Sequence, residues 1–267
     1  MRRTLSLIFM GLFSGMVVTE TTYGSAPEFT NLSDSDVEAI LTDVGATWTH
    51  TSVSPASTLG ELFGFEVGLV AGGAKVPNIE KFSREVDPNS EVSVLPQAGL
   101  LGAVSIPAGI KFELLLFPEN EIDDLTFKYG SIGVQWTLTQ SLLQLPADLA
   151  VKVHSATATL NYNQEINSVN TAVEIEDKVS GLSLIASKKL VLFEPYIGLG
   201  VVKMDGSFSL SGTETFLDSN LQSASKEKSG GHFFVGTNMS ILFLKAGLEF
   251  SRVFDSSKLA AKFSFSF

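Results

Sequence analysis

The chain has 267 residues, a formal net charge of −11, no cysteine and a mean hydropathy of +0.25. This length can bury a sizeable core in one large domain or two small ones. The lack of cysteine excludes disulfide scaffolds, thiol nucleophiles, Cys-ligated zinc and iron–sulfur clusters. The acidic balance argues against nucleic acid as a partner, which requires a basic surface. Since the mean hydropathy is high for an acidic soluble protein, we expect part of the apolar surface to face lipid.

The amino-terminal residues have the pattern of an export signal. Arg2 and Arg3 precede an apolar run over residues 5–18. A basic start followed by an apolar stretch of this length is typical of a secretory signal peptide and is too short for a retained spanning helix. We therefore expect residues 1–26 to be a signal peptide that is cleaved on export, with an earlier cut near residue 18 as the alternative.

Residues 27–59 are expected to form an N-terminal helix and a linker. Ser35 and Glu38 have the S-x-x-E spacing of a capping box, and apolar residues follow at i, i+3, i+4 and i+7. Gly45 offers a helix stop. The pattern predicts one helix over about residues 35–44 and then a Ser/Thr-rich stretch. We expect this unit before the first strand on the periplasmic side, with the helix plugging the lumen, lying against the barrel base or docking on the membrane surface.

From residue 61 to residue 267 the helical period is replaced by a period of two. One set of alternating positions is rich in Leu, Val, Ile and Phe, and the other carries Gly, Ser and charges of both signs. Such strands have one apolar and one polar face. The pattern favours a transmembrane barrel with an apolar exterior and a polar interior. A soluble periplasmic β-protein that binds an apolar ligand is the alternative. The most apolar stretch, 95–117, contains prolines and charges that disfavour a spanning helix.

The expected fold is an all-β, transmembrane, antiparallel up-and-down barrel of about ten strands. Because bacterial barrels have an even number of strands, twelve is the second choice, with an added strand over 46–56 and one further strand, for instance from a split of 191–216, and eight is less favoured. Polar stretches are expected as outer loops and short stretches as inner turns. The expected loops are 77–91, 118–123, 163–170 and 213–228. The expected strands lie near 61–76, 92–105, 108–117, 124–139, 147–162, 171–188, 191–212, 229–241, 243–254 and 257–267.

The chain ends on aromatic residues at alternate positions, Phe263, Phe265 and Phe267. This ending resembles the C-terminal insertion signal of Gram-negative outer-membrane β-barrel proteins. The resemblance covers the last strand strongly and residues 61–267 by pattern only. It implies an exported protein of the bacterial cell outer membrane, in contact with outer-membrane lipid. It also implies that the barrel-assembly machinery recognises the C-terminal strand.

Charged side chains on the small-residue face are expected to line the lumen. Charges of both signs on one inner wall can pair across it, since an unpaired buried charge is costly. They can alternatively form a polar pathway for small solutes. The lumen-lining candidates are Glu66, Lys111, Glu113, Lys128, Lys152, His154, Glu194, Lys203, Lys245, Glu249 and Lys262.

No catalytic motif is present in the sequence. A G-x-S-x-G elbow, an H-E-x-x-H pair, a phosphate-binding P-loop and a helix-opening G-x-G-x-x-G are all absent. Acidic residues over 119–124 and 174–177 lack the spacing of a calcium loop and are expected to be solvated. We expect no catalytic residue, no metal and no cofactor. The predicted function is a non-enzymatic barrel, either a narrow conduit for an unidentified small solute or a structural or surface-interaction protein. The alternative is a barrel enzyme that acts on lipid or peptide at the outer rim through His154 or His232.

Overall fold

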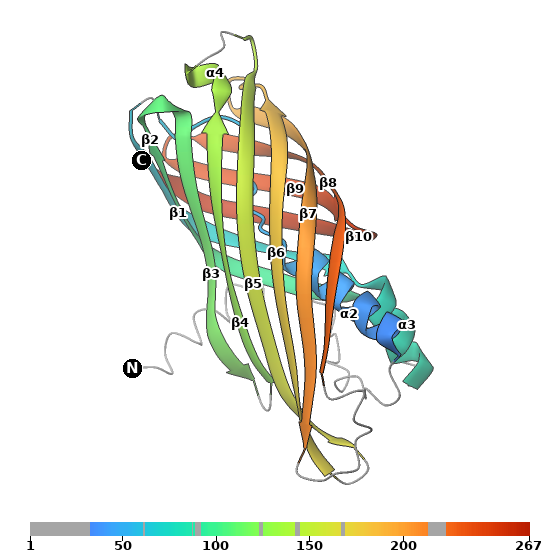
Figure 1. Cartoon of the computed structure of the whole chain (residues 1–267). Helices are drawn as coiled ribbons and strands as arrows, with labels where there is room; N and C mark the ends of the chain where they lie inside the picture. Colours follow the sequence, from blue (N-terminus) through green and yellow to red (C-terminus); the bar gives the residue numbers. More distant parts are fainter. Residues whose placement is uncertain are drawn as a thin grey trace, which may run out of the picture.

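A computed structural model describes residues 33–60, 62–86, 88, 92–122, 125–141, 145–166, 169–212 and 223–267 (Figure 1). The expected signal peptide, residues 1–26, lies outside these ranges. In the part that is described, ten antiparallel strands close into one barrel, and each strand pairs with its neighbours in the sequence. The first strand pairs with the last, which closes the sheet. The expected all-β up-and-down barrel of ten strands is confirmed.

The strands are β1 (Gly64–Lys75), β2 (Val94–Ile106), β3 (Ile110–Ile122), β4 (Leu125–Thr137), β5 (Asp148–Ile166), β6 (Val169–Ser187), β7 (Phe193–Gly212), β8 (Ser223–Ile241), β9 (Leu244–Val253) and β10 (Ser256–Ser266). The described helices are α2 (Asp34–Trp48), α3 (Pro77–Val86), the single turn α4 (Leu138–Ser141) and the 3-10 turn η1 (Pro107–Gly109). None of the helices in the described ranges is long and apolar enough to cross a membrane.

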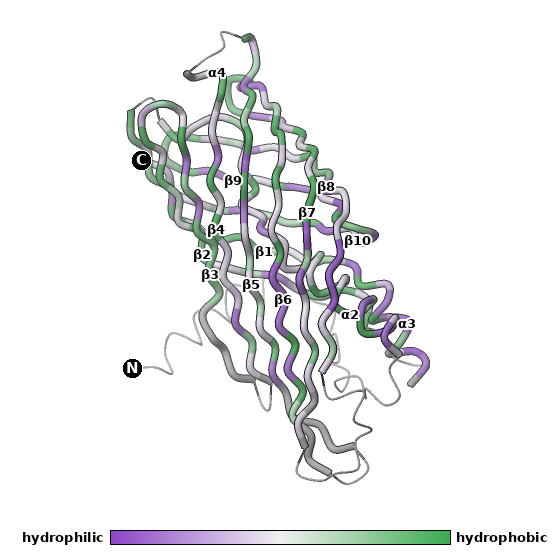
Figure 2. Tube along the Cα trace, viewed as in Figure 1, coloured by the Kyte–Doolittle hydropathy of each residue, from purple (hydrophilic) through white to green (hydrophobic). Residues whose placement is uncertain are grey.

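The bulky apolar side chains of the strands point outward. In β7, Leu199 and Val201 are each 62% exposed, whereas Val202 and Met204 are buried. The outward apolar run of this strand extends over residues 193–201, which matches the length of about nine to eleven residues that a tilted strand needs to cross a bilayer. Hydrophobic and hydrophilic residues alternate along the strands in Figure 2. The expected apolar exterior is therefore present.

The two ends of the barrel differ. We call the end that holds Phe267, η1 and α4 the C-terminal end, and the opposite end, where α2 and α3 lie, the helix end (Figure 1). Strands β5–β8 have 19 or 20 residues each, against 10 to 12 in β1, β9 and β10. The longer strands extend past the apolar band at the helix end. There the outward face becomes polar, with Lys203 and Asp205 following Val201 in β7.

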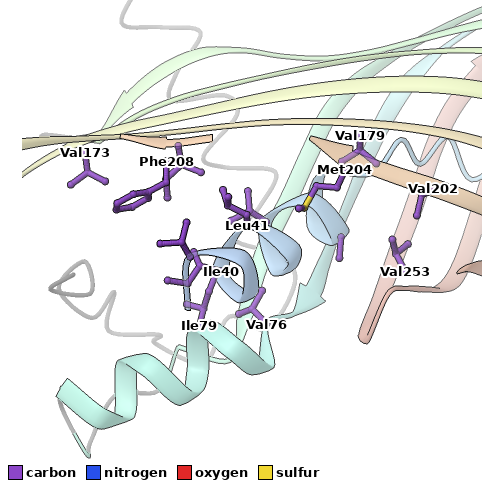
Figure 3. Close-up of a cluster of buried hydrophobic side chains, with 14 residues drawn as sticks. Ile40, Leu41, Val76, Ile79, Val173, Val179, Val202, Met204, Phe208 and Val253 are labelled. Atoms are coloured by element: carbon purple, nitrogen blue, oxygen red, sulfur yellow. The ribbon is translucent and has the colours of Figure 1, made fainter. Parts of the chain in front are cut away.

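An apolar cluster fills the barrel at the helix end (Figure 3). The apolar side of α2, with Ile40 and Leu41, packs against Met204 and Phe208 of β7, and Ile79 of α3 joins the same cluster. Two glycines permit this close contact. A Cβ on Gly45 of α2 would lie 2.9 Å from Met204 Cγ, and a Cβ on Gly206 of β7 would lie 3.1 Å from Leu41 Cδ1. The described part of the molecule therefore has a packed core inside the barrel.

Several expected element boundaries were wrong. The helix α2 is capped by Ser33, whose amide donates to Asp36 Oδ2 at 2.9 Å, and not by the predicted pair at positions 35 and 38. It continues through Gly45 to Trp48, because packing against Met204 favours a small residue there without a helix stop. Residues 77–86, expected as a loop, form α3. The expected loops at 118–123 and 163–170 belong largely to β3, β5 and β6.

Candidate functional site in the barrel lumen

The irregular segment after α2 occupies the interior of the barrel. We call residues 49–60 the thread. Its residues Thr49 to Ala56 are buried, and Val53 adopts a left-handed φ of 49°. A β-branched residue rarely adopts this conformation, so the surrounding wall must hold it in place. The thread and α2 together fill the lumen with the protein's own chain.

The thread continues from α2, which is fixed to α3 and to the wall at the helix end. The carboxylate of Asp43 accepts hydrogen bonds from the backbone amides of Asn78 and Ile79, at 2.8 and 3.0 Å, at the start of α3. Amides at the start of a helix lack partners within the helix, and this position stabilises a negatively charged group. Asp43 therefore joins the two helices.

Lysines of the wall bind the backbone and hydroxyl groups of the thread. Lys258 Nζ donates to the carbonyl oxygens of Thr47 and Thr49, at 2.9 and 2.8 Å. Further along, Lys152 Nζ donates to Ser52 Oγ at 2.9 Å. Carbonyls at the end of a helix and in an irregular segment lack regular backbone partners, so these contacts supply part of the hydrogen bonding that burial requires.

Near its start, the thread is fixed through His50. Its Nδ1 lies 2.8 Å from Ser131 Oγ and its Nε2 lies 3.1 Å from Glu113 Oε2. The same carboxylate pairs with Lys152 at 2.9 Å and with Lys111 at 3.1 Å. The side chain of Glu113 is fully enclosed, so these cationic and hydrogen-bonding partners compensate its desolvation.

The second half of the thread contacts the wall near the C-terminal end. The Gln135 amide donates to the carbonyl of Ala56 at 3.0 Å, and the amide of Ala56 donates to Ser187 Oγ at 3.2 Å. Ser57 Oγ donates to Glu194 Oε2 at 2.9 Å. These polar contacts extend along most of the thread. Apolar packing adds to them, because Val53 and Ala56 belong to buried apolar clusters inside the barrel.

A second charge cluster lies beside the second half of the thread. Glu66 pairs with Lys262 at 2.8 Å and with Lys245 at 3.8 Å, and it accepts a hydrogen bond from Ser264 at 2.6 Å. A cavity of about 20 Å³ lies next to this cluster and is also lined by Glu194. It has room for about one water molecule.

The structure places most of the predicted lumen residues inside the barrel. Glu66, Lys111, Glu113, Lys152, His154, Glu194, Glu249 and Lys262 are buried there, and Lys245 is mostly buried. Two assignments were wrong, because Lys128 and Lys203 lie on the outer surface. Each has the strand parity of the outward apolar residues in its own strand, Ile132 in β4 and Val201 in β7.

All three histidines of the chain meet inside the barrel. The rings of His50 and His154 are stacked with centroids 5.8 Å apart, and His232 lies 6.2 Å from His154. His232 is therefore not at the outer rim, where the sequence pattern predicted it. Neither ring nitrogen of His154 has a hydrogen-bond partner among the described residues. Sequence reasoning missed His50 as a lumen residue, because an irregular segment has no periodicity that would assign its side chains to a face.

The chemistry available at this site is restricted by burial. Ser131, His50 and Glu113 form a hydroxyl–imidazole–carboxylate chain, the connectivity on which acyl-transfer enzymes rely. However, Ser131 is 3% exposed and its hydroxyl also accepts a hydrogen bond from Tyr129 at 2.9 Å. We therefore assign a structural role to these three side chains: their hydrogen bonds hold the thread against the barrel wall. Nowhere in the described ranges do three His, Asp or Glu side chains form a group that could hold a metal ion.

The closed ten-strand sheet, apolar exterior and polar interior define a small outer-membrane β-barrel whose lumen contains its own amino-terminal segment. The family model described as "Family of unknown function (DUF6588)" matches residues 83–267, and the chain belongs to this family.

Solved barrels with a similar fold share little sequence with this chain. Ail, the attachment invasion locus protein of Yersinia pestis, has 10% identity and a TM-score of 0.33, and the match covers 78% of this chain and 100% of Ail. The translocator domain of the autotransporter NalP from Neisseria meningitidis has 6% identity and a TM-score of 0.47, with 78% and 89% covered. The outer membrane protease OmpT from Escherichia coli has 9% identity and a TM-score of 0.40, with 79% and 100% covered. A search of curated proteins finds no match.

Proposed function

We propose that this protein is an integral protein of the bacterial outer membrane whose barrel is closed at rest, and that it serves a structural or surface-interaction role. The observation that carries the proposal is the occupied lumen. Residues 37–57 are largely buried inside the barrel, from the apolar cluster at the helix end to the hydrogen bonds near the C-terminal end. A solute has no free path where the chain itself fills the cross-section.

Removing α2 from the lumen would be costly. Its residues Val37, Ile40, Leu41 and Val44 are at most 6% exposed. Burying an aliphatic side chain of this size contributes about 1.5–3 kcal/mol. In addition, Asp43 of α2 accepts hydrogen bonds from α3, and Lys258 of the wall donates hydrogen bonds to the end of α2 and the start of the thread. A barrel closed in this way supports a structural role better than free diffusion of a solute.

The location is part of the same proposal. The outward apolar band, together with the terminal aromatic residues of β10, supports insertion into outer-membrane lipid after cleavage of the signal peptide. We further propose that the barrel-assembly machinery recognises β10. Fractionation with outer membranes and slower gel migration after heating test the location.

Ion conductance in planar lipid bilayers tests the closed barrel. We expect no steady current from the refolded chain, and bursts of current from Leu41→Asp, because a carboxylate in the apolar cluster would dislodge α2. The matched control is Ser35→Asp, an exposed position of the same helix. Heat-modifiable migration would show that each variant is folded. A steady current from the unmodified chain would refute the proposal, and silence of Leu41→Asp would contradict the assignment of α2 as the closing element.

The second candidate is a narrow conduit, which opens when the second half of the thread shifts. The Ser/Thr-rich contacts of the thread and the cavity beside Glu66 favour it, since such hydrogen bonds can exchange with water. Transient current from the unmodified chain, with α2 in place, would support this candidate.

A further inference from the structure

Together, α2 and the thread connect the two ends of the barrel. At the helix end, Asp34 at the start of α2 pairs with Lys226 of β8 at 3.3 Å. At the other end, the amide of Leu59 donates to Ser105 Oγ at 3.0 Å, next to η1. From there the chain enters β1, where Phe65 pairs with Phe267 at the C-terminal end. Residues 34 and 59 therefore lie at opposite mouths of one lumen.

The contacts that α2 and the thread make with β10 follow the order of both segments. Ser256 at the start of β10 contacts Asp43, at 3.3 Å. Lys258 contacts the carbonyls of Thr47 and Thr49, and Lys262 lies 3.4 Å from Ser54 Oγ. The chain thus runs through the lumen parallel to β10, without folding back on itself.

The orientation of the barrel decides which mouth faces outward. In bacterial outer-membrane barrels the short turns face the periplasm and the longer, polar extensions face the exterior. At the C-terminal end the apolar band reaches the strand ends, with Phe193 49% exposed at the start of β7, whereas the helix end has the extended strands with a polar outer surface and the longest connection, residues 76–93. This step rests on the proposed location in the outer membrane, which makes the helix end the outer one.

We infer that the chain crosses the outer membrane an additional time through its own lumen, so that the amino-terminal end of α2 is displayed on the cell surface. Ser33, Asp34 and Ser35 are exposed at this mouth. The barrel therefore presents an amino-terminal helix end to the exterior, and a segment attached before Ser33 has its point of attachment outside the cell. This places the amino-terminal unit opposite to the periplasmic position expected from the sequence.

The absence of cysteine from the chain makes the test direct. Single variants Ser35→Cys, Lys81→Cys and Lys189→Cys place one thiol at the start of α2, on α3 and in the turn before β7, all at exposed positions. A membrane-impermeant maleimide is applied to intact cells and, separately, to permeabilised cells. We expect Ser35→Cys and Lys81→Cys to react in intact cells, and Lys189→Cys to react only after permeabilisation.

The outcomes separate this inference from the proposed function. Labelling of Lys81→Cys but not Ser35→Cys in intact cells would overturn the inference and leave the barrel orientation intact. Labelling of Lys189→Cys in place of Lys81→Cys would reverse the orientation and overturn the inference, whereas the closed barrel of the proposed function is tested separately by the conductance measurement.

A cross-link between α2 and the wall provides a second readout. An ideal Cβ at Gly206 lies 3.2 Å from Leu41 Cβ, within a few tenths of an ångström of the separation that disulfides use. The double variant Leu41→Cys/Gly206→Cys should therefore form a disulfide in cells, detected as a shift in gel migration on reduction. The matched control is Leu41→Cys/Gly102→Cys, because nothing lies within 4 Å of a Cβ at Gly102. Failure of the first pair in folded protein, or equal cross-linking in both pairs, would contradict a helix inside the lumen.

Discussion

Glu113 is the residue on which the electrostatics of the central lumen depend. Its carboxylate is fully enclosed and is shared by Lys111, Lys152 and His50, at distances of 2.9 to 3.1 Å. Two buried wall lysines and the imidazole of the thread all pair with this one carboxylate. Removing one partner of such a group costs more than breaking a surface ion pair, because the remaining buried charges are left uncompensated.

We expect Glu113→Gln to destabilise the folded barrel by about 3–5 kcal/mol, since the substitution removes the carboxylate that pairs with the buried Lys111 and Lys152. Denaturant unfolding of the refolded protein, followed by loss of the heat-modifiable form, measures the change. The control is Glu85→Gln on α3, where an exposed pair with Lys81 contributes about 1 kcal/mol or less. Equal shifts for both variants would show that the buried cluster adds nothing beyond a surface pair.

At the same scale, strand parity explains both what the sequence predicts and where the prediction failed. Lys152 alternates with the outward Val151 and Val153 in β5, so its inward direction can be derived from the sequence. Lys203 follows Val201 at the outward parity, but beyond the apolar band a charge can face water on the outer surface. Alternation gives the face of a residue, and the position along the strand then decides whether that face meets lipid or water.

The packing of α2 against β7 depends on a glycine in the strand. Gly206 lies opposite Leu41, and a Cβ there would meet three Leu41 carbons at 3.1 to 3.2 Å. We expect Gly206→Val to destabilise the protein by about 1–3 kcal/mol through overpacking, and to displace α2. Denaturant unfolding measures the loss, and a change in Trp48 fluorescence reports the displacement, because Trp48 packs on Phe127.

Gly231→Val is the matched control for this prediction. Gly231 lies in the neighbouring strand β8 and faces outward, and a Cβ added to it would have no atom within 4 Å. Valine there should be neutral or slightly stabilising, since strands favour β-branched residues. If Gly206→Val behaves like this control, α2 is not in tight contact with the wall.

The elements differ in how far the sequence determines them. The ten strands follow from their period of two, and the ends of most of them lie within a few residues of the prediction. The helix α3 was missed although Pro77 at its start and the spacing of Ile79 and Phe82 are helix signals. The thread has no period at all. Its conformation depends on partners far away in the sequence, such as Ser131 and Lys258, which no local pattern identifies.

For the whole molecule, the barrel can be predicted from the sequence, but the segment that fills its lumen cannot. The sequence contains enough information for strand number, closure and an apolar exterior, because these follow from patterns repeated in every strand. Residues 46–56, considered as a strand in the twelve-strand alternative, instead continue α2 and enter the thread. Whether such a segment lies outside, below or within a barrel depends on the width of the closed sheet and on the side chains that fill it.

Closure of the barrel depends on the last residues of β10. The amide of Phe267 donates to the carbonyl of Phe65, and the amide of Phe65 donates to the carbonyl of Phe267, both at 2.8 Å. Residue 265 pairs with Val67 one step further along the same strands. Removing residues 265–267 exposes backbone groups of β1 to hydrocarbon, where each unsatisfied group costs several kcal/mol. We therefore expect this truncation to abolish the heat-modifiable form, both in cells and after refolding in detergent.

The variant Phe267→Ala separates closure from recognition by the assembly machinery. It keeps both backbone hydrogen bonds and removes only the phenyl ring, which is 74% exposed and contributes little to packing. We expect normal refolding in detergent and a several-fold lower amount of folded barrel in the outer membrane of cells, because the exposed ring would be lost as a recognition element. The control is Leu259→Ala, an equally outward residue of β10 away from the chain end. Equal yields in cells for Phe267→Ala and Leu259→Ala would show that the terminal aromatic is not recognised, and a refolding defect would assign its role to closure.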